Sequence, residues 1–384
     1  MATEDAAVIG AEVGMSLADV PTPALVIDLD RMDRNLASWQ DAVSASGKKF
    51  RPHIKTHKTP TIALLQEQLG ACGIAAAKPS EAEAFYEAGC RDIVVAYPSV
   101  GQDKWARLAR MARDARIATN VDSEQQARGL SAVATAAGVT IGTQIEIDTG
   151  LHRVGYEPAA FDEILAFARL LISLPGIEFH GITTHRGKFD ERLAKMSNDE
   201  AGREEGEILV ELAERLRHAG VPVNEVTAGG TITGRGVATV DGVTEVRAGT
   251  YVFYDAMQVA FGSAQPEDVA VSILATVVST RRTGSATIDA GSKTFSGDRA
   301  VVGGAMPGAD VISRGVGIDA AVTRITEEHG MVDLGDGVSV EVGQRLQFTP
   351  FHICTAVNLS NELVGVRNGA VEQVWPVRAR GART

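Results

Sequence analysis

The sequence predicts a parallel (β/α)8 barrel followed by a β-rich domain, and three observations favour this fold. Eight short β-branched runs alternate with longer amphipathic stretches between residues 49 and 253. No GxGxxG motif follows an early strand, which disfavours a doubly wound dinucleotide-binding sheet. After Asp255 the helical patterns give way to short strands with Gly, Asp and Pro at their turns. We therefore expect a barrel over residues 1–255 and a second domain over residues 256–384.

Each predicted barrel strand is rich in β-branched residues and bounded by turn residues. The strands are expected at residues 49–55, 73–77, 92–96, 116–121, 140–148, 177–185, 225–229 and 245–253. Such nearly continuous apolar runs are typical of parallel strands that are buried on both faces. Residues 232–244 show no clear helical pattern, so the barrel is least well defined between its last two strands.

Helices are predicted in the intervals between these strands. Two of them should begin at Ser80 and Ser123, because Glu83 and Gln126 stand three residues later, the spacing of a capping box. A third helix follows Pro158 and carries Leu, Ile and Phe residues along one face.

The second domain should consist mainly of short strands. They are expected at residues 269–281, 285–289, 331–334, 337–342, 346–349 and 371–377. A further strand at residues 24–30 precedes the first barrel helix and could pair with either domain. The first 30 residues could therefore pack with the β-rich domain rather than with the barrel.

Composition and charge limit the possible functions. The chain has 37 basic and 49 acidic residues, a net charge of −12, which argues against a nucleic-acid partner. No apolar run is long enough to cross a bilayer, and no cationic and apolar leader opens the sequence. Three widely spaced cysteines, an odd number, argue against a disulfide framework. We expect a soluble protein of the reduced cytoplasm.

Chemically useful side chains stand at the predicted C-terminal ends of the barrel strands, where the active sites of such barrels form. Lys55 ends the first strand, Arg153 lies in the loop after the fifth, and His185 ends the sixth. A partly dehydrated lysine has a lowered pKa, and its neutral amine can attack a carbonyl carbon. Because a lysine beside a proline is more often a solvated surface residue, the neighbouring loops decide its role.

Two loops that contain glycine end the last two predicted strands. Residues 228–231 read Ala-Gly-Gly-Thr, and residues 247–250 read Arg-Ala-Gly-Thr. Such loops can present backbone N–H groups and a hydroxyl to a phosphate without an intervening Cβ. A lysine, a phosphate-binding loop and a barrel together suggest pyridoxal phosphate, held by Lys55 as a Schiff base.

His352 and Cys354 form a second candidate site. They stand two residues apart on a segment expected to be extended, which would place both side chains on one face. The two ligand types suit zinc, and two protein ligands would leave positions open for water and substrate. Taken alone, the pair is better explained as a small buried cysteine and a core histidine.

The sequence resembles the fold-type III pyridoxal phosphate enzymes, and among them the D-threonine aldolase and D-serine dehydratase-like family. The resemblance rests on residues 22–30, 51–58, 147–150, 228–231, 249–253, 288–291 and 351–358. The PHIKTHK run and the C-terminal HIC…VN run are specific to this family. The DTG…RVG run is shared with alanine racemases.

The resemblance implies a role for each matching residue. Lys55 would form the Schiff base, Arg153 would contact the phenolic oxygen of the cofactor, and Arg247 would face its pyridine nitrogen. The phosphate would be held by Gly229, Gly230, Thr231, Gly249 and Thr250. A guanidinium at the pyridine nitrogen keeps it unprotonated, which suits closely coupled loss of the proton and the leaving group. His185 could stack on the ring, act as a base, or only pack.

The resemblance also implies a homodimeric lyase that acts on β-hydroxy-D-amino acids, with zinc or manganese at His352 and Cys354. Cys354 and Arg247 favour dehydration of D-serine or D-threo-3-hydroxyaspartate to a 2-oxo acid and ammonia. Aldol cleavage of D-threonine to glycine and an aldehyde is the alternative. An amino-acid racemase or a pyridoxal phosphate carrier would have no evident use for the metal. Arg186 is a candidate clamp for a second substrate carboxylate.

Overall fold

The computed structural model describes residues 10–187, 191–297 and 311–384. The chain forms two compact units. The first consists of Met1–Leu36, Thr56–Thr59 and Thr250–Gly381, and the second of Ala37–Lys55, Pro60–Gly249 and Ala382–Thr384. The chain therefore passes between the units several times, and helix α1 (Leu29–Ala45) begins in one unit and ends in the other.

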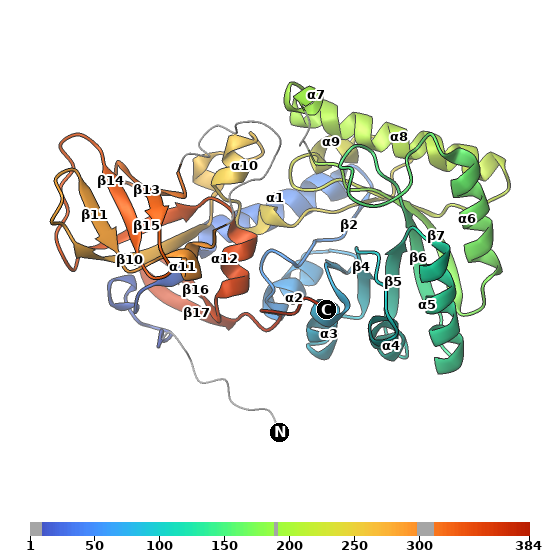
Figure 1. The fold of residues 1–384 in the computed structure, drawn as a ribbon, viewed down its shortest axis with the longest axis horizontal. Coiled ribbons are helices and arrows are strands. Elements are labelled where there is room, and N and C mark those ends of the chain that lie inside the picture. Colours follow the sequence, from blue (N-terminus) through green and yellow to red (C-terminus); the bar gives the residue numbers. More distant parts are fainter. Residues whose placement is uncertain (1–9, 188–190, 298–310) are drawn as a thin grey trace. The chain divides into compact units, whose positions relative to one another are not determined.

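The second unit is built on eight parallel strands, as predicted (Figure 1). The strands are β2 (Lys49–Phe50), β3 (Ile74–Ala76), β4 (Asp92–Val95), β5 (Arg116–Val121), β6 (Ile141–Glu146), β7 (Ile177–Thr183), β8 (Glu225–Ala228) and β9 (Glu245–Val246). Their order is β2-β9-β8-β7-β6-β5-β4-β3.

An isolated parallel bridge between His53 and Ala75 joins the two ends of this sheet. The Ala75 N–H donates to the Pro52 carbonyl, and the Ile54 N–H donates to the Ala75 carbonyl, each at 2.8 Å. The sheet is thereby closed into a barrel. The seam consists of these few hydrogen bonds and lies directly before Lys55 in the sequence.

The barrel strands are mostly shorter than predicted. The first ends at Phe50 rather than residue 55, because Pro52 has no N–H to donate to a strand ladder. The last ends at Val246 rather than residue 253, and Thr250–Val252 instead form a 3-10 helix, η2. Only the strand predicted at residues 116–121 keeps its bounds, as β5.

Helices lie on the outer face of the barrel, and Figure 1 shows α4, α5 and α6 beside the strands. The helices after α1 are α2 (Pro60–Gln68), α3 (Pro79–Glu87), α4 (Gln102–Met111), α5 (Glu124–Ala137), α6 (Phe161–Ser173), α7 (Glu191–Ala194), α8 (Asn198–His218) and α9 (Gly234–Ala238). Helix α6 buries Ile164, Phe167 and Leu171 of the face predicted after Pro158, whereas Leu165 and Leu170, which the prediction included, are only half-buried.

The two predicted capping boxes are wrong. Helix α3 begins at Pro79, a favoured first position, with Lys78 as its N-cap and no side-chain cap. Ser123 is the N-cap of α5 but makes no capping hydrogen bond, and Gln126 Oε1 instead accepts the Asp122 N–H at 2.9 Å. Helix α9 lies in residues 232–244, where the sequence showed no helical pattern.

The first unit contains a nine-stranded sheet in the order β11-β14-β13-β12-β15-β10-β1-β16-β17. The strands are β1 (Ala24–Asp28), β10 (Val271–Ser279), β11 (Ser285–Ile288), β12 (Ser313–Gly315), β13 (Ala320–Ile325), β14 (Gly330–Leu334), β15 (Arg345–Pro350), β16 (Glu362–Arg367) and β17 (Ala370–Pro376). Strand β11 also pairs with β10, so six antiparallel strands close into a second, smaller barrel. The expectation of a β-rich C-terminal domain is confirmed.

Strand β1 pairs with β10 and β16, so it belongs to this unit, one of the two possibilities that the sequence left open. The predicted strand at residues 337–342 is wrong, because that segment forms turns. Strands β12, β13 and β16 were not predicted. The remaining helices are η1 (Leu17–Asp19), α10 (Ala256–Ala260), η3 (Pro266–Asp268), α11 (Ser292–Phe295) and α12 (Ile353–Leu359).

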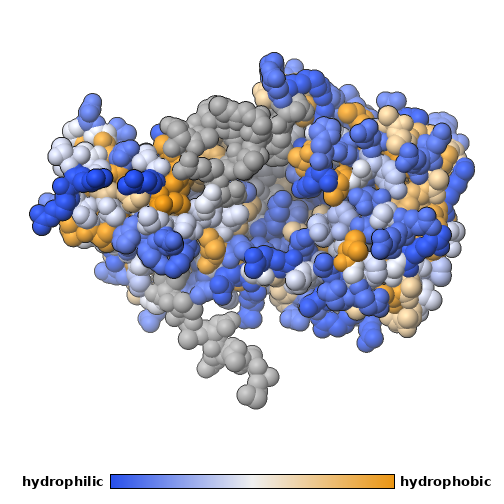
Figure 2. Space-filling model, in the orientation of Figure 1, coloured by the Kyte–Doolittle hydropathy of each residue, from blue (hydrophilic) through white to orange (hydrophobic). Residues whose placement is uncertain are grey.

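On the face drawn in Figure 2, hydrophilic residues predominate and apolar residues form small separate groups. The large apolar side chains exposed within the described residues are scattered in sequence, for example Val13, Leu69 and Val342. None of the helices in the described part of the chain is both long and apolar enough to span a bilayer.

Candidate active site

The PHIKTHK run folds as a turn that follows the barrel seam. The Lys55 N–H donates to His53 Nδ1 at 3.3 Å, and the Thr59 N–H donates to His57 Nδ1 at 3.2 Å. The two histidines therefore shape the backbone on either side of Lys55. Lys55 itself is half-buried and is the last residue of its segment before the chain passes to the other unit.

Lys55, Arg153 and Arg247 place positive charge around two half-buried histidines. Burial is the main cause that lowers the pKa of His185 to about 3, and the charges of Lys55, Arg153 and Arg247 lower it further. The pKa of His53 is also lowered well below its usual value, by burial and then by Lys55. Both imidazoles are therefore neutral near pH 7, and the cations in this region attract an anionic ligand.

The loop that carries Arg153 is shaped by the DTG motif. Asp148 Oδ1 accepts the N–H groups of Gly150 and His152 at 2.9 and 3.0 Å, which turns the chain back on itself. The Tyr156 N–H then donates to the Glu146 carbonyl at 3.0 Å, so the loop returns to the end of β6. This explains why the aspartate and glycine of the motif stand two residues apart.

The glycine loop after β8 packs against His185. Gly229 has a φ of +92°, and a Cβ at Gly230 would lie 2.9 Å from His185 Cε1. His185 Nδ1 is 3.4 Å from the Gly229 carbonyl oxygen, and the Gly249 N–H donates to Thr231 Oγ1 at 3.3 Å. The two predicted glycine loops are thereby joined, and only glycine fits where the imidazole lies.

One guanidinium nitrogen of Arg247 donates no hydrogen bond to any of the described residues. Its Nη2 donates to Thr183 Oγ1 at 2.5 Å and to the Thr184 carbonyl at 3.3 Å. Its Nη1 is buried without a hydrogen-bond partner among the described residues. Burial lowers the pKa of Arg247, partly offset by Glu146. A buried, unpartnered guanidinium nitrogen fits an acceptor such as the pyridine nitrogen of pyridoxal phosphate.

Two buried carboxylates in this unit were missed by the sequence analysis. Glu146 ends β6, receives a hydrogen bond from Asn120 Nδ2, and has a pKa raised to about 7 by burial, although Arg247 and Arg153 oppose the shift. Glu205 lies on α8 and accepts two backbone N–H groups. The only signal for Glu146 was a carboxylate within a predicted barrel strand, and Glu205 gave none.

Arg186 is not free to clamp a substrate carboxylate. Its side chain is only 2% exposed, and its Nη2 pairs with Glu204 Oε1 at 2.6 Å. Hydrogen bonds from Arg192 and Arg186 lower the pKa of Glu204 to about 2, although burial opposes them. The guanidinium charge of Arg186 is therefore matched within the barrel unit.

The candidate metal ligands lie in the other unit, and their predicted geometry is wrong. His352 is the N-cap of α12 and Cys354 is in its first turn, so the pair does not lie on an extended strand. The helix begins here because Asp255 Oδ2 accepts the Ile353 N–H at 3.0 Å. Burial raises the pKa of Asp255, and the nearby His352 lowers it.

Two threonine hydroxyls surround Cys354. Its Sγ lies 3.3 Å from Thr56 Oγ1 and 4.0 Å from Thr250 Oγ1. Cys354 is half-buried and forms no disulfide bond with the other two cysteines. The described residues contain no group of three or more His, Cys, Asp or Glu side chains that could hold a metal ion. A metal at His352 and Cys354 would therefore need water or substrate as further ligands.

The predicted site residues thus fall into two groups. Eight lie in the barrel unit: Lys55, Arg153, His185, Gly229, Gly230, Thr231, Arg247 and Gly249. Thr250, His352 and Cys354 lie in the other unit, where Thr250 and Cys354 are in contact.

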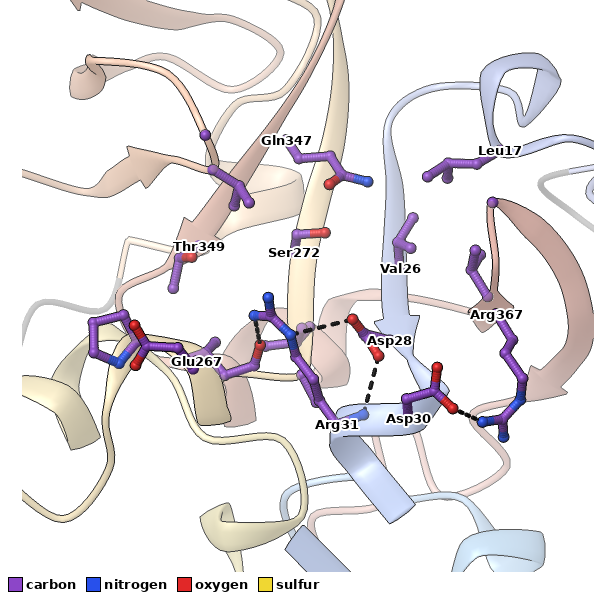
Figure 3. Close-up of a pocket in the computed structure, with 18 of the residues that line it drawn as sticks. Leu17, Val26, Asp28, Asp30, Arg31, Glu267, Ser272, Gln347, Thr349 and Arg367 are labelled. Carbon is purple, nitrogen blue, oxygen red and sulfur yellow. Dashed lines mark hydrogen bonds and ion pairs between the residues drawn. The ribbon is translucent and has the colours of Figure 1, made fainter. Parts of the chain in front are cut away.

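The β-rich unit also has a cavity of about 480 Å³ (Figure 3). Its two arginines are paired with lining carboxylates: Arg31 lies 3.2 Å from Asp28 and donates to the Val269 carbonyl, and Arg367 pairs with Asp30. None of the predicted site residues lines it. Glu267 also lines the cavity, so three carboxylates face two arginines there and the lining offers no excess positive charge to an anionic cofactor.

Comparisons with known proteins match both parts of the chain. Residues 27–256 match the family described as "Alanine racemase, N-terminal domain", and residues 270–366 match the "Putative serine dehydratase domain". A D-threonine aldolase from Arthrobacter sp. is 34% identical over 380 residues, which is 97% of this chain and 96% of that protein. A D-threo-3-hydroxyaspartate dehydratase from Delftia sp. (strain HT23) is 34% identical over 362 residues, 88% of this chain and 92% of that protein.

Solved structures give the same result. The D-threonine aldolase from Filomicrobium marinum superposes with a TM-score of 0.88 at 30% identity, covering 97% of this chain and all of the other. The Delftia dehydratase superposes with a TM-score of 0.85 at 32% identity, covering 94% of this chain and 98% of the other. A variant of that dehydratase with a cysteine replaced by alanine has been solved in a metal-free form.

Proposed function

Because this chain belongs to the fold-type III pyridoxal phosphate enzymes, with an alanine racemase-type barrel followed by a serine dehydratase-type domain, we propose that it is a metal-dependent D-amino acid dehydratase. The expected substrates are D-serine and D-threo-3-hydroxyaspartate, and the products are a 2-oxo acid and ammonia. The relatives are lyases that act on β-hydroxy-D-amino acids, and the residues of both units suit that reaction class.

The observation that carries the proposal is the cationic cluster of Lys55, Arg153 and Arg247 around a neutral His185. This cluster and the unpartnered Nη1 of Arg247 fit a cofactor that has a phosphate, a phenolic oxygen and a ring nitrogen. Lys55 would hold the aldehyde, Arg153 the phenolic oxygen and Arg247 the ring nitrogen. The phosphate would be bound by Gly230, Thr231, Gly249 and Thr250, with Gly229 allowing the turn through its positive φ.

When bound, pyridoxal phosphate withdraws electrons from the substrate Cα and so makes the Cα–H bond acidic. The neutral amine of Lys55 would then take the Cα proton. Arg247 favours a reaction in which the β-hydroxyl leaves together with this proton transfer, because its guanidinium cannot protonate the ring nitrogen. Loss of water and hydrolysis of the enamine product give the 2-oxo acid and ammonia.

His352 and Cys354 would hold a zinc or manganese ion, which would supply a Lewis acid at the β-hydroxyl. Imidazole and thiolate are suitable ligands for zinc, and the neighbouring Asp255 is buried beside His352. A cysteine-to-alanine variant of a D-threo-3-hydroxyaspartate dehydratase was solved in a metal-free form, which supports metal binding in this family. We propose that residues 1–255 bind the cofactor and that residues 256–384 bind the metal.

Aldol cleavage is the second candidate, because a D-threonine aldolase is as similar to this chain as the dehydratase is. Aldol cleavage needs a base that removes the proton of the β-hydroxyl. His185 is poorly suited to that task, because an imidazole with a pKa of about 3 holds a proton only weakly at pH 7. This electrostatic environment favours dehydration.

Two further points belong to the proposal. A homodimer is expected from the family. A cytoplasmic location is supported by Cys72, Cys90 and Cys354, none of which forms a disulfide bond in the described structure, since a reducing compartment disfavours disulfides.

Product analysis tests the proposal directly. The protein is incubated with pyridoxal phosphate and zinc or manganese, and separately with D-serine, D-threonine, D-threo-3-hydroxyaspartate and their L-enantiomers. Equal amounts of 2-oxo acid and ammonia from the D-enantiomers are expected. Glycine with an aldehyde would instead identify an aldolase, and no turnover of any D-substrate would refute both lyase assignments.

A further inference from the structure

We propose that Glu205 is a positioning residue that fixes the phosphate-binding loop and His185 relative to each other; this inference rests on the proposed function. Glu205 lies on α8 and is fully buried. One carboxylate oxygen, Oε1, accepts the Arg186 N–H at 3.2 Å and the Gly229 N–H at 3.1 Å. Arg186 follows β7 and Gly229 follows β8, so a single oxygen joins the ends of two barrel strands.

These two amides are next to the groups that matter for cofactor binding. Arg186 directly follows His185, and Gly229 opens the glycine loop. Because a Cβ at Gly230 would lie 2.9 Å from His185 Cε1, the imidazole packs closely on the loop. Movement of either amide away from Glu205 would therefore change both the position of the ring and the shape of the loop.

The Gly229 N–H is directed at Glu205 and so does not point toward a phosphate. The phosphate would then be bound by the residues after Gly229, whose positions depend on this hydrogen bond. A carboxylate that held the phosphate itself would repel it, whereas one that holds only the backbone behind the loop orients the loop without contacting the ligand.

Helix α8 can approach the loop closely because of its small residues. A Cβ at Gly202 would lie 2.1 Å from the Thr233 carbonyl oxygen, and a Cβ at Gly206 would lie 2.9 Å from Val240 Cγ2. Gly202 stands three residues before Glu205, so both lie on the same side of the helix. The helix is thereby fixed at the distance from which the carboxylate reaches both amides.

The proposed role needs a hydrogen-bond acceptor more than a negative charge. Burial raises the pKa of the Glu205 side chain, although hydrogen bonds from the Thr233 side chain and from the two backbone N–H groups oppose the shift. Glutamine keeps an oxygen in place of Oε1, methionine removes it at similar size, and aspartate withdraws it by one methylene. The three substitutions therefore separate the acceptor from the charge and from the packing.

A second buried glutamate provides a matched control. Glu81 on α3 is also fully buried and accepts the N–H of Ala77, which follows β3, at 2.5 Å. It holds one strand end that carries none of the proposed cofactor ligands. Glu81→Met should therefore reproduce the loss of packing and of one buried acceptor without disturbing the glycine loop.

The test compares E205Q, E205M, E205D and E81M in the full-length protein stripped of cofactor. The affinity for pyridoxal phosphate is measured from the absorbance of the lysine-bound cofactor, together with the thermal midpoint and amide hydrogen exchange at Gly229. We expect E205M and E205D to bind pyridoxal phosphate about 10- to 100-fold more weakly, with faster exchange at Gly229. E205Q should stay within about threefold of the wild type, and E81M should lower only the thermal midpoint.

Unchanged affinity for pyridoxal phosphate in E205M or E205D would overturn the inference. An equal loss of this affinity in E81M would also overturn it, because Glu205 would then contribute only to the general stability of the barrel. E205D keeps the test decisive if E205M does not fold. A wild-type protein that binds no pyridoxal phosphate would refute the proposed function itself, and this outcome is distinct from wild-type binding with no effect of the Glu205 substitutions.

Discussion

Arg247 illustrates how one side chain can limit the chemistry of a site. It is held by Thr183 and Thr184 on one side, while Nη1 points away from any partner among the described residues. The guanidinium remains charged despite its burial, so it can donate a hydrogen bond but cannot supply a proton. If Arg247 contacts the ring nitrogen as proposed, it favours coupled elimination over a long-lived carbanion.

Substitution of Cys354 should remove the metal without unfolding the protein. We expect C354A to lower the affinity for zinc about 10- to 100-fold, because only His352 would remain of the proposed pair. Metal content after dialysis, measured by mass spectrometry, checks this. C90A is the control, since Cys90 is a buried thiol in the barrel unit, and equal zinc content in both variants would contradict the assignment.

Glu146 should give the protein a distinctive pH dependence. Its folded-state pKa is raised to about 7 from 4.5, so between these values the folded state binds more protons than the unfolded state. Its contribution to the free energy of unfolding therefore falls as the pH rises from about 4.5 to 7, by up to about 3 kcal/mol. Chemical denaturation of wild type and E146Q at pH 5 and pH 7.5 should show the fall in the wild type and a smaller fall in E146Q.

At the scale of elements, charged residues near the starts of the barrel strands form a network. Arg116 on β5 lies 2.5 Å from Glu225 on β8, and His180 Nδ1 on β7 lies 3.6 Å from the same carboxylate. Hydrogen bonding to His180 lowers the pKa of Glu225 to about 2 although burial opposes it, and raises the pKa of His180 in return.

This network should stabilise the barrel most between pH 4.5 and pH 6.5. The contribution of Glu225 is lost as the pH falls from 4.5 toward 2, and that of His180 is lost as the pH rises through its raised pKa. E225Q should flatten both slopes in a plot of thermal midpoint against pH. A plot for E225Q that runs parallel to that of the wild type would show that the network does not control this dependence.

The same scale shows what the sequence could and could not predict. Strand β5 and the buried face of α6 follow from local periodicity, so both were predicted. The ends of β2 and β9 depend on where the chain leaves the barrel, which is a tertiary property. Strand β16 was missed because Gly365 interrupts its pattern; the glycine is needed there, since a Cβ would lie 2.9 Å from Leu29 Cδ2. Hydrogen bonds between distant residues, such as those of Glu205, leave no local pattern at all.

At the scale of the whole molecule, the two units cannot be separated by one cut near residue 255, because the chain passes between them several times. Strand β1 lies near the N-terminus but pairs with β10 and β16, which come after residue 270. A fragment that ends at residue 255 would keep β1 and lose both of its neighbours, leaving an apolar strand with two open edges.

We therefore expect the fragment 1–255 to aggregate, and the fragment 37–249 to be more soluble because it keeps all eight barrel strands. Light scattering and the dispersion of amide signals in NMR spectra of the two fragments check this. A monodisperse, folded fragment 1–255 would show that β1 tolerates the loss of its partners.

The barrel seam between Pro52, Ile54 and Ala75 also has a consequence for how the protein matures. The hydrogen bonds of the seam complete the ring of strands, and Lys55 directly follows Ile54 in the chain. If Lys55 bonds to the cofactor as proposed, the cofactor should bind most tightly to molecules whose ring is closed and so favour the folded state by mass action. A supply of cofactor would then lower the fraction of newly made chains that are incompletely folded, and with it their exposure to proteolysis.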